Sequence, residues 1–231
     1  MIVAERKDID EILQLLAPYK RVLVLGCGSC VTVCLTGGEK QAEELATLLN
    51  LAAKQKNLPL KVEFDCITRQ CDREFIANLK GDLAGYDAVL SIACGVGVGF
   101  MSEQFPKVAI LPGLNTTFYG ANTAPGEWKE YCHGCGECVL AWTGGICPIA
   151  RCSKSLINGT CGGTNDGKCE VKQEMDCAWY LIYKRLQELG RLNELSTFRP
   201  ARNWSKDRSR GVRRLSHAEL AQEPEQEEAH S

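Results

Sequence analysis

Residues 131–177 read YCHGCGECVLAWTGGICPIARCSKSLINGTCGGTNDGKCEVKQEMDC, and the organisation of the chain depends on this stretch. It holds eight of the 14 cysteines: Cys132, Cys135, Cys138, Cys147, Cys152, Cys161, Cys169 and Cys177. The stretch is rich in glycine and cysteine and poor in large aliphatic side chains. It therefore cannot bury enough apolar surface to offset the entropy lost when its backbone is ordered. Disulfides or bound metal must hold it together.

Composition and charge indicate a soluble protein. Of the 231 residues, 45% are hydrophobic and 24% are charged, and the formal net charge is −2. This composition is ordinary for a globular protein, and the charge gives no reason to expect nucleic acid or an anionic membrane as a partner. Neither a signal peptide nor an uninterrupted run of ~20 apolar residues is present, so we expect a cytoplasmic protein without membrane insertion. Closely spaced cysteines in that reducing compartment favour metal over disulfides.

Residues 1–115 predict a Rossmann-like α/β domain. Continuously apolar segments at 21–25, 60–64, 88–93 and 107–111 are typical of buried parallel strands, and they alternate with helical patterns at 8–17, 39–54 and 72–79. Asp8 is a plausible N-cap of the first helix and Pro18 ends it. In the second helix, the residues at core spacing are Leu45, Leu48, Leu49 and Ala52.

The alternation stops near residue 115, and two further regions follow. Residues 116–198 are predicted to be a cysteine-rich, cluster-binding segment that ends in a helix over 178–190, with Trp179, Ile182, Leu186 and Leu189 on one side and Gly190 after its last turn. Residues 199–231 are predicted to be an extended charged tail, basic at first and then acidic. The tail is either a solvated extension or, over residues 198–204, an arm that lies on a partner subunit.

A first cysteine set follows the first predicted strand of the parallel sheet. Cys27, Cys30 and Cys34 lie on the loop after this strand, and their spacing suits three corners of a 4Fe–4S cluster. The loop lacks the third glycine of a dinucleotide-binding fingerprint. The first and third strands of a doubly wound sheet are often neighbours, so Cys94, at the end of the third strand, is the predicted fourth ligand. Cys66 and Cys71 lie near the same edge and are possible substitutes.

A second cysteine set lies in residues 131–177. Cys132, Cys135 and Cys138 are each three residues apart, and Cys147 precedes Pro148, as the last cysteine does in bacterial ferredoxins. The surrounding glycines allow backbone N–H groups to approach the cluster sulfides. With Cys152, Cys161, Cys169 and Cys177, the eight thiols could hold two clusters, or one cluster and one zinc ion. For His133, a role beside the ligands or at the surface is favoured over ligation.

No substrate-processing site is recognisable in the sequence. There is no Ser/His/acid set and no flavin or nicotinamide fingerprint. Clusters without an organic redox site imply a non-catalytic relay that passes single electrons to a cofactor in another protein.

Several motifs resemble one known family. They are GGICPIARCSKSLINGTCGG from Gly144, GKCEV from Gly167, DCAW from Asp176, GCGSC from Gly26 and ACGVG from Ala93. Together they are similar to the MetV-type iron–sulfur small subunit of bacterial methylenetetrahydrofolate reductase, over residues 20–204. Thr160 is a departure, because the family pattern has proline there.

The resemblance implies a function for the chain. It would carry two or more 4Fe–4S clusters, with zinc also associated with such complexes, and FAD would lie only in the partner. The partners would be the flavin-containing catalytic subunit, which reduces methylenetetrahydrofolate to methyltetrahydrofolate, and an electron donor such as ferredoxin or another iron–sulfur protein. Two alternatives stay open: a structural zinc protein, and an iron–sulfur accessory protein of another one-carbon or corrinoid methyl-transfer complex.

Overall fold

The computed structural model describes residues 1–80, 82–207 and 211–217, and these divide into two compact units. Unit 1 comprises residues 1–133 and 149–155, and unit 2 comprises residues 134–148 and the chain from residue 156 onward. Within the described residues, no helix is long and apolar enough to span a membrane.

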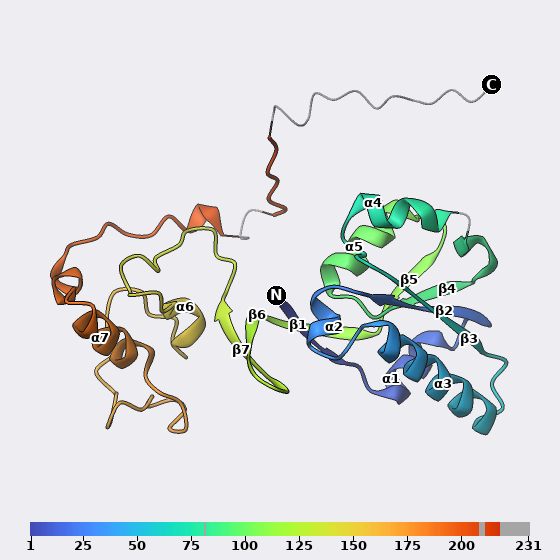
Figure 1. The fold of residues 1–231 in the computed structure, drawn as a ribbon, viewed down its shortest axis with the longest axis horizontal. Helices are drawn as coiled ribbons and strands as arrows, with labels where there is room; N and C mark the ends of the chain where they lie inside the picture. The colour runs from blue at the N-terminus through green and yellow to red at the C-terminus, as the bar shows by residue number, and fades with distance from the viewer. Residues whose placement is uncertain (81, 208–210, 218–231) are drawn as a thin grey trace. The chain divides into compact units, whose positions relative to one another are not determined.

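Unit 1 contains the predicted parallel sheet (Figure 1). Its four strands are β2 (Arg21–Cys27), β3 (Lys61–Ile67), β4 (Ala88–Ser91) and β5 (Ala109–Pro112), in the spatial order β3-β2-β4-β5. All three strand pairs are parallel. The first and third strands of the parallel sheet, β2 and β4, are neighbours, as the sequence predicted. The strands β3 and β4 lie on opposite sides of β2. The topological switch point therefore lies at the carboxyl ends of β2 and β4.

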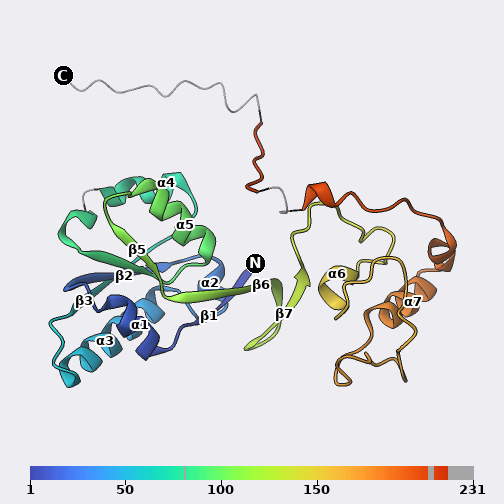
Figure 2. The ribbon, with the colours of Figure 1, turned by 180° about the vertical axis from the view of Figure 1, so that it is seen from behind.

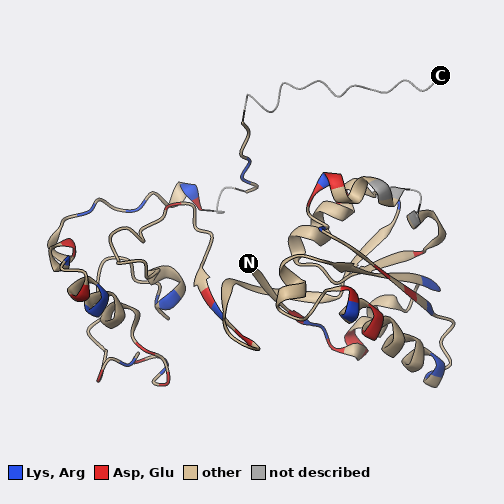
Figure 3. Ribbon diagram, in the orientation of Figure 1, with Lys and Arg blue, Asp and Glu red and all other residues tan. Residues whose placement is uncertain are grey.

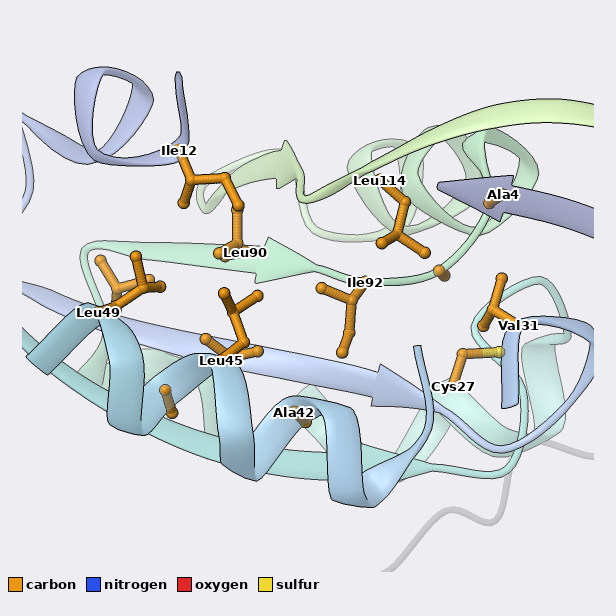
Figure 4. Close-up of a cluster of buried hydrophobic side chains, with 14 of the residues drawn as sticks. Ala4, Ile12, Cys27, Val31, Ala42, Leu45, Leu49, Leu90, Ile92 and Leu114 are labelled. Atoms are coloured by element: carbon orange, nitrogen blue, oxygen red, sulfur yellow. The ribbon is translucent and has the colours of Figure 1, made fainter. Parts of the chain in front are cut away.

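Helices cover both faces of this sheet, which confirms the predicted α/β class (Figure 1). One face packs against α1 (Ile9–Leu16) and α3 (Glu39–Gln55), and Figure 4 shows Leu45 and Leu49 of α3 directed at Leu90 and Ile92. The other face packs against α4 (Arg73–Ile76), two 3₁₀ turns (Ala77–Lys80 and Asp82–Gly85) and α5 (Gly95–Gln104). The short helix α2 (Cys30–Val33) follows β2. The Asp8 carboxylate accepts a hydrogen bond from the Asp10 N–H at 2.8 Å, so Asp8 is the N-cap of α1 as predicted.

Two features of this layered structure differ from the sequence predictions. Leu48, which was expected in the core, is 42% exposed on α3, while Leu45 and Leu49 are fully buried. The helix α5 was not predicted, because its sequence GVGVGFMSEQ is glycine-rich and has no apolar face at helical spacing.

A second, antiparallel sheet in unit 1 was also not predicted. It has the order β1-β6-β7 and consists of β1 (Ile2–Arg6), β6 (Leu114–Ala124) and β7 (Glu127–Cys132). The N-terminal strand pairs with β6, and β6 forms a hairpin with β7. Because β1 ties this hairpin to the start of the chain, the first compact unit extends to His133 and not only to the predicted limit at residue 115.

Unit 2 consists mainly of loops (Figure 2). Its longest helix is α7 (Ala178–Glu188), which begins one turn before the predicted core positions Ile182 and Leu186 and ends before Gly190, whose φ is +66°. Two 3₁₀ turns follow, Leu192–Ser196 and Trp204–Lys206. The helix α6 (Pro148–Arg151) begins at the Pro148 that was expected to turn the chain, and its residues after Pro148 belong to unit 1. Leu189, expected on the buried side of α7, is 42% exposed.

A charged cluster joins the amino-terminal ends of the parallel strands. The Glu63 carboxylate accepts hydrogen bonds from Lys61 Nζ at 2.6 Å, Tyr86 Oη at 2.6 Å and Arg21 Nη2 at 3.3 Å. The Arg21 guanidinium also lies 4.9 Å from the centre of the Tyr86 ring. These contacts, among which the bond from Lys61 has the largest effect, lower the pKa of Glu63 to about 2. Elsewhere in the unit, charges of both signs are interspersed, for example along α3 (Figure 3).

We expect Glu63→Gln to destabilise unit 1 at neutral pH. The folded-state pKa of Glu63 lies below its ordinary value of 4.5. Its carboxylate therefore contributes stability above that value, and the contribution is lost as the pH falls toward 2. The melting temperatures of the variant and the wild type should differ most at pH 7 and converge between pH 4.5 and pH 2. The exposed α3 substitution Glu43→Gln is the control. A difference that is independent of pH would contradict this assignment.

Candidate metal centres

Four cysteines lie at the carboxyl edge of the parallel sheet. Cys27 is the last residue of β2, Cys66 is the next-to-last residue of β3 and pairs with Gly26, and Cys94 follows β4 as the N-cap of α5. Cys71 lies on the loop between β3 and α4. Ligand sites in sheets of this topology form at this edge, beside the switch point. The fold therefore brings the predicted pair Cys27 and Cys94 to one edge, together with both substitute residues.

Burial and neighbouring thiols raise the pKa of two of these cysteines. Burial raises the pKa of Cys71, and the Cys94 and Cys27 thiols add to the increase. Burial, and next the Cys27 thiol, raise the pKa of Cys66 to about 11. The neighbouring thiols act in this direction because a like charge disfavours the thiolate.

A buried glutamine joins the segments that contain these three cysteines. Gln70 is fully buried, and its Nε2 donates hydrogen bonds to the carbonyl oxygens of Leu25 at 2.8 Å and Gly26 at 3.0 Å. Its Oε1 accepts a hydrogen bond of 2.6 Å from the hydroxyl of Ser91, which is also fully buried. The Ser91 Oγ in turn accepts the Ala93 N–H at 3.3 Å.

The two remaining members of the first predicted set lie on α2. Cys30 is its first residue and is partly exposed. Cys34 follows its last residue and is 5% exposed. The Cys34 Sγ lies 3.2 Å from Thr36 Oγ1 and donates to the carbonyl oxygen of Val31 at 3.6 Å, and it also contacts the Ala4 carbonyl of β1 at 4.0 Å. The Cys34 thiol is thus directed toward β1 and the chain after α2.

The second predicted set is divided between the two units. Cys132 ends β7 in unit 1, where the neighbouring His133 Nδ1 lies 3.9 Å from the Glu130 carboxylate, and Cys152 also belongs to unit 1. The other six thiols belong to unit 2: Cys135, Cys138, Cys147, Cys161, Cys169 and Cys177.

One backbone N–H group of a glycine approaches a cysteine sulfur in unit 2. The Gly163 N–H donates to Cys161 Sγ at 3.4 Å. The carboxylate of Glu170 packs on Gly163 so closely that a Cβ atom there would lie 1.6 Å from Glu170 Oε2. Cys177 is the N-cap of α7, and its N–H donates to the carbonyl of Gly167 at 2.7 Å.

The basic residues after position 198 contact the loop that contains Cys135. We call residues 134–138 the cysteine loop and the described residues from 199 to 217 the arm. Arg202 donates to the carbonyl oxygens of Cys135 at 2.9 Å and Glu137 at 3.0 Å, and Arg213 donates to that of Gly134 at 3.1 Å. The Glu137 carboxylate accepts the Asn203 N–H at 3.0 Å, and this bond lowers the pKa of Glu137.

The arm lies so close to the cysteine loop that one position admits only glycine. Gly136 has φ +84°, and a Cβ atom there would lie 2.4 Å from the Lys206 carbonyl oxygen. The sequence did not predict this contact. The signal that could have indicated it is the concentration of arginine after residue 198, which is suited to capping free carbonyl groups.

None of the 14 cysteines, all of which lie in the described part of the chain, forms a disulfide, and soft sulfur donors suit iron–sulfur clusters and zinc. The donor chemistry therefore fits the groups that the sequence predicts. Within residues 1–80, 82–207 and 211–217, however, no group of three or more His, Cys, Asp and Glu side chains is arranged to hold a metal ion. Binding thus requires the thiols to reorient. A cubane cluster bonds each thiolate to a different iron, so its ligands must surround the cluster and need not meet at one point.

The family comparison agrees with the resemblance at a coarser level. An α/β unit with free thiols at its switch point, followed by a cysteine-rich unit, defines a candidate metalloprotein. Residues 111–205 match the family model described as methylene-tetrahydrofolate reductase C terminal, so this part of the chain is similar to that family. No curated protein and no solved structure matches the chain.

Proposed function

We propose that this chain is the iron–sulfur electron-transfer subunit of a methylenetetrahydrofolate reductase complex. It would receive electrons from ferredoxin or another iron–sulfur donor and pass them to the flavin of a partner subunit. That partner would reduce methylenetetrahydrofolate to methyltetrahydrofolate. When bound, the clusters would supply the one-electron redox chemistry, which no amino-acid side chain in the chain provides.

One observation supports this proposal above the others. The whole of the cysteine-rich stretch, residues 131–177, lies within residues 111–205, the range that matches the methylene-tetrahydrofolate reductase C-terminal family. None of the cysteines there forms a disulfide, and thiolate sulfur is a donor that iron–sulfur clusters and zinc prefer. The residues that are similar to this family therefore include the cysteines that could bind a metal.

The test is purification of the full chain without oxygen, followed by metal and sulfide analysis. We expect brown protein with about eight iron atoms per chain, as two four-iron clusters would give. The dithionite-reduced chain, freed of excess dithionite, should then bleach the flavin absorbance of a purified flavin-containing methylenetetrahydrofolate reductase subunit. Colourless protein that contains only zinc, or iron-loaded protein that leaves the flavin oxidised, would contradict the proposal.

A further inference from the structure

The hydrogen bonds of Gln70 connect three positions that are each followed directly by a cysteine. Gly26 precedes Cys27, Gln70 precedes Cys71 and Ala93 precedes Cys94. The Gly26 carbonyl, the Gln70 amide, the Ser91 hydroxyl and the Ala93 N–H form one continuous chain of hydrogen bonds. Both side chains in this chain are fully buried. Buried polar networks that are fully paired fix the backbone around them, so the relative positions of the three cysteines are fixed as well.

The surrounding packing strengthens this arrangement. The Gly28 N–H donates to the Ile67 carbonyl at 2.8 Å, which holds the loop after β2 against the loop after β3. At Gly97 in α5, a Cβ atom would lie 3.0 Å from the Cβ of Gln70 and 2.9 Å from that of Ala93. The glycine thus allows α5 to approach the glutamine closely, and the segment with Cys71 is held between β2 and α5.

Cys71 and Cys34 differ in what surrounds their thiols. Cys34 is 5% exposed, much like Cys27 and Cys94, but its sulfur bonds the Val31 carbonyl and Thr36 and is directed toward β1. Cys71 is exposed, and it directly follows Gln70, whose side chain bonds the Gly26 carbonyl and the Ser91 hydroxyl. Cluster ligands must share one site. The hydrogen bonds of Gln70 hold the segment of Cys71 beside those of Cys27 and Cys94, whereas the sulfur of Cys34 is engaged elsewhere.

We infer that Cys71, and not Cys34, binds the first cluster together with Cys27 and Cys94. Cys30, on the loop after β2, is then the fourth ligand. This inference rests on the proposed function, because it assigns residues to a cluster that the proposal requires. This ligand set differs from the one predicted from the spacing of Cys27, Cys30 and Cys34. The difference arises because the sheet topology and Gln70 place Cys71, from a different loop, at the same edge of the sheet.

Matched alanine variants test the assignment. The full chain is purified without oxygen as wild type, Cys71→Ala and Cys34→Ala, and iron and acid-labile sulfide are measured. Alanine is used because a serine hydroxyl could itself bind iron. We expect Cys71→Ala to lose about half of the iron, as loss of one of two four-iron clusters would give, and Cys34→Ala to keep the wild-type content. The spectrum of the dithionite-reduced protein in electron paramagnetic resonance should lose one cluster signal only in Cys71→Ala.

A second measurement uses the wild-type chain alone. The exposed Cys71 thiol should resist N-ethylmaleimide in the iron-loaded protein and react after a chelator removes the iron. Equal labelling of Cys71 before and after chelation, or full iron in Cys71→Ala with half in Cys34→Ala, would overturn the inference and leave the proposed function intact. Wild-type protein that holds no iron would overturn the proposed function as well.

Discussion

Cys147→Ala should make residues 134–148 and 156–177 of unit 2 sensitive to proteases in the iron-loaded protein, while unit 1 stays resistant. Within the described part of unit 2, the buried aliphatic and aromatic side chains, proline aside, are Ala178, Ile182 and Leu186, all on α7. So small a core cannot offset the entropy of ordering the long loops before it. We therefore attribute the order of this segment to bound metal, whose free energy in structural sites is on the order of 10 kcal/mol.

Limited proteolysis with mass spectrometry measures this effect. Loss of one ligand should raise the rate of first cleavage within residues 134–148 and 156–177 by about tenfold or more, since each 1.4 kcal/mol corresponds to about a factor of ten. Cys66→Ala is the matched control, because it makes the same chemical change in unit 1 at a partly exposed thiol that is not assigned to a cluster. If both variants are cut at the same sites and rates, bound metal does not maintain the order of unit 2.

Gln70→Leu should destabilise unit 1 by about 3 kcal/mol. The substitution keeps most of the side-chain volume but removes the partner of the buried Ser91 hydroxyl and of the carbonyls of Leu25 and Gly26. An unsatisfied buried polar group costs about 1–3 kcal/mol, and several are created here. For a chain of this length, the melting temperature should fall by about 6–12 °C.

Circular dichroism of the wild type and two variants checks this value. Gln55→Leu, at the exposed end of α3, is the control and should melt close to the wild type. If Gln70→Leu has the same melting temperature as Gln55→Leu, the hydrogen bonds of Gln70 contribute nothing to the stability of unit 1.

The parallel sheet could be predicted from the sequence because its strands are continuously apolar. Segments such as 21–25 and 88–93 have this pattern, and their flanking helices have clear apolar faces. The antiparallel sheet could not be predicted in the same way. Its longest strand, β6, reads LNTTFYGANTA, which is mostly polar, and it is stabilised by pairing with β1 at the other end of unit 1. Local sequence does not encode a partner more than 100 residues away, as in the contact of Thr117 Oγ1 with the Val3 carbonyl, 114 positions apart.

The same distinction applies to the candidate site: its strand order could be predicted, but the contacts of a single loop residue could not. The register of β2 with β4 brings Cys27 near Cys94, and this neighbourhood follows from the usual strand order of such sheets. The role of Gln70 did not follow from the sequence, because a single polar residue in a loop gives no sign that it is buried. Cys71 was therefore only a substitute ligand in the sequence-based prediction, and its position beside Cys27 and Cys94 became clear from the fold.

The contact between the arm and the cysteine loop has a consequence for the order of events on the ribosome. Arg202 is made 65 residues after Glu137, whose carbonyl it binds. At ~5–20 residues per second, the interval between the two is roughly 3–13 s. During that time the arm cannot yet contact the cysteine loop. Under the proposed function, this interval is when iron and sulfide would reach the thiol of Cys135 before Arg202 binds the carbonyl groups of the loop.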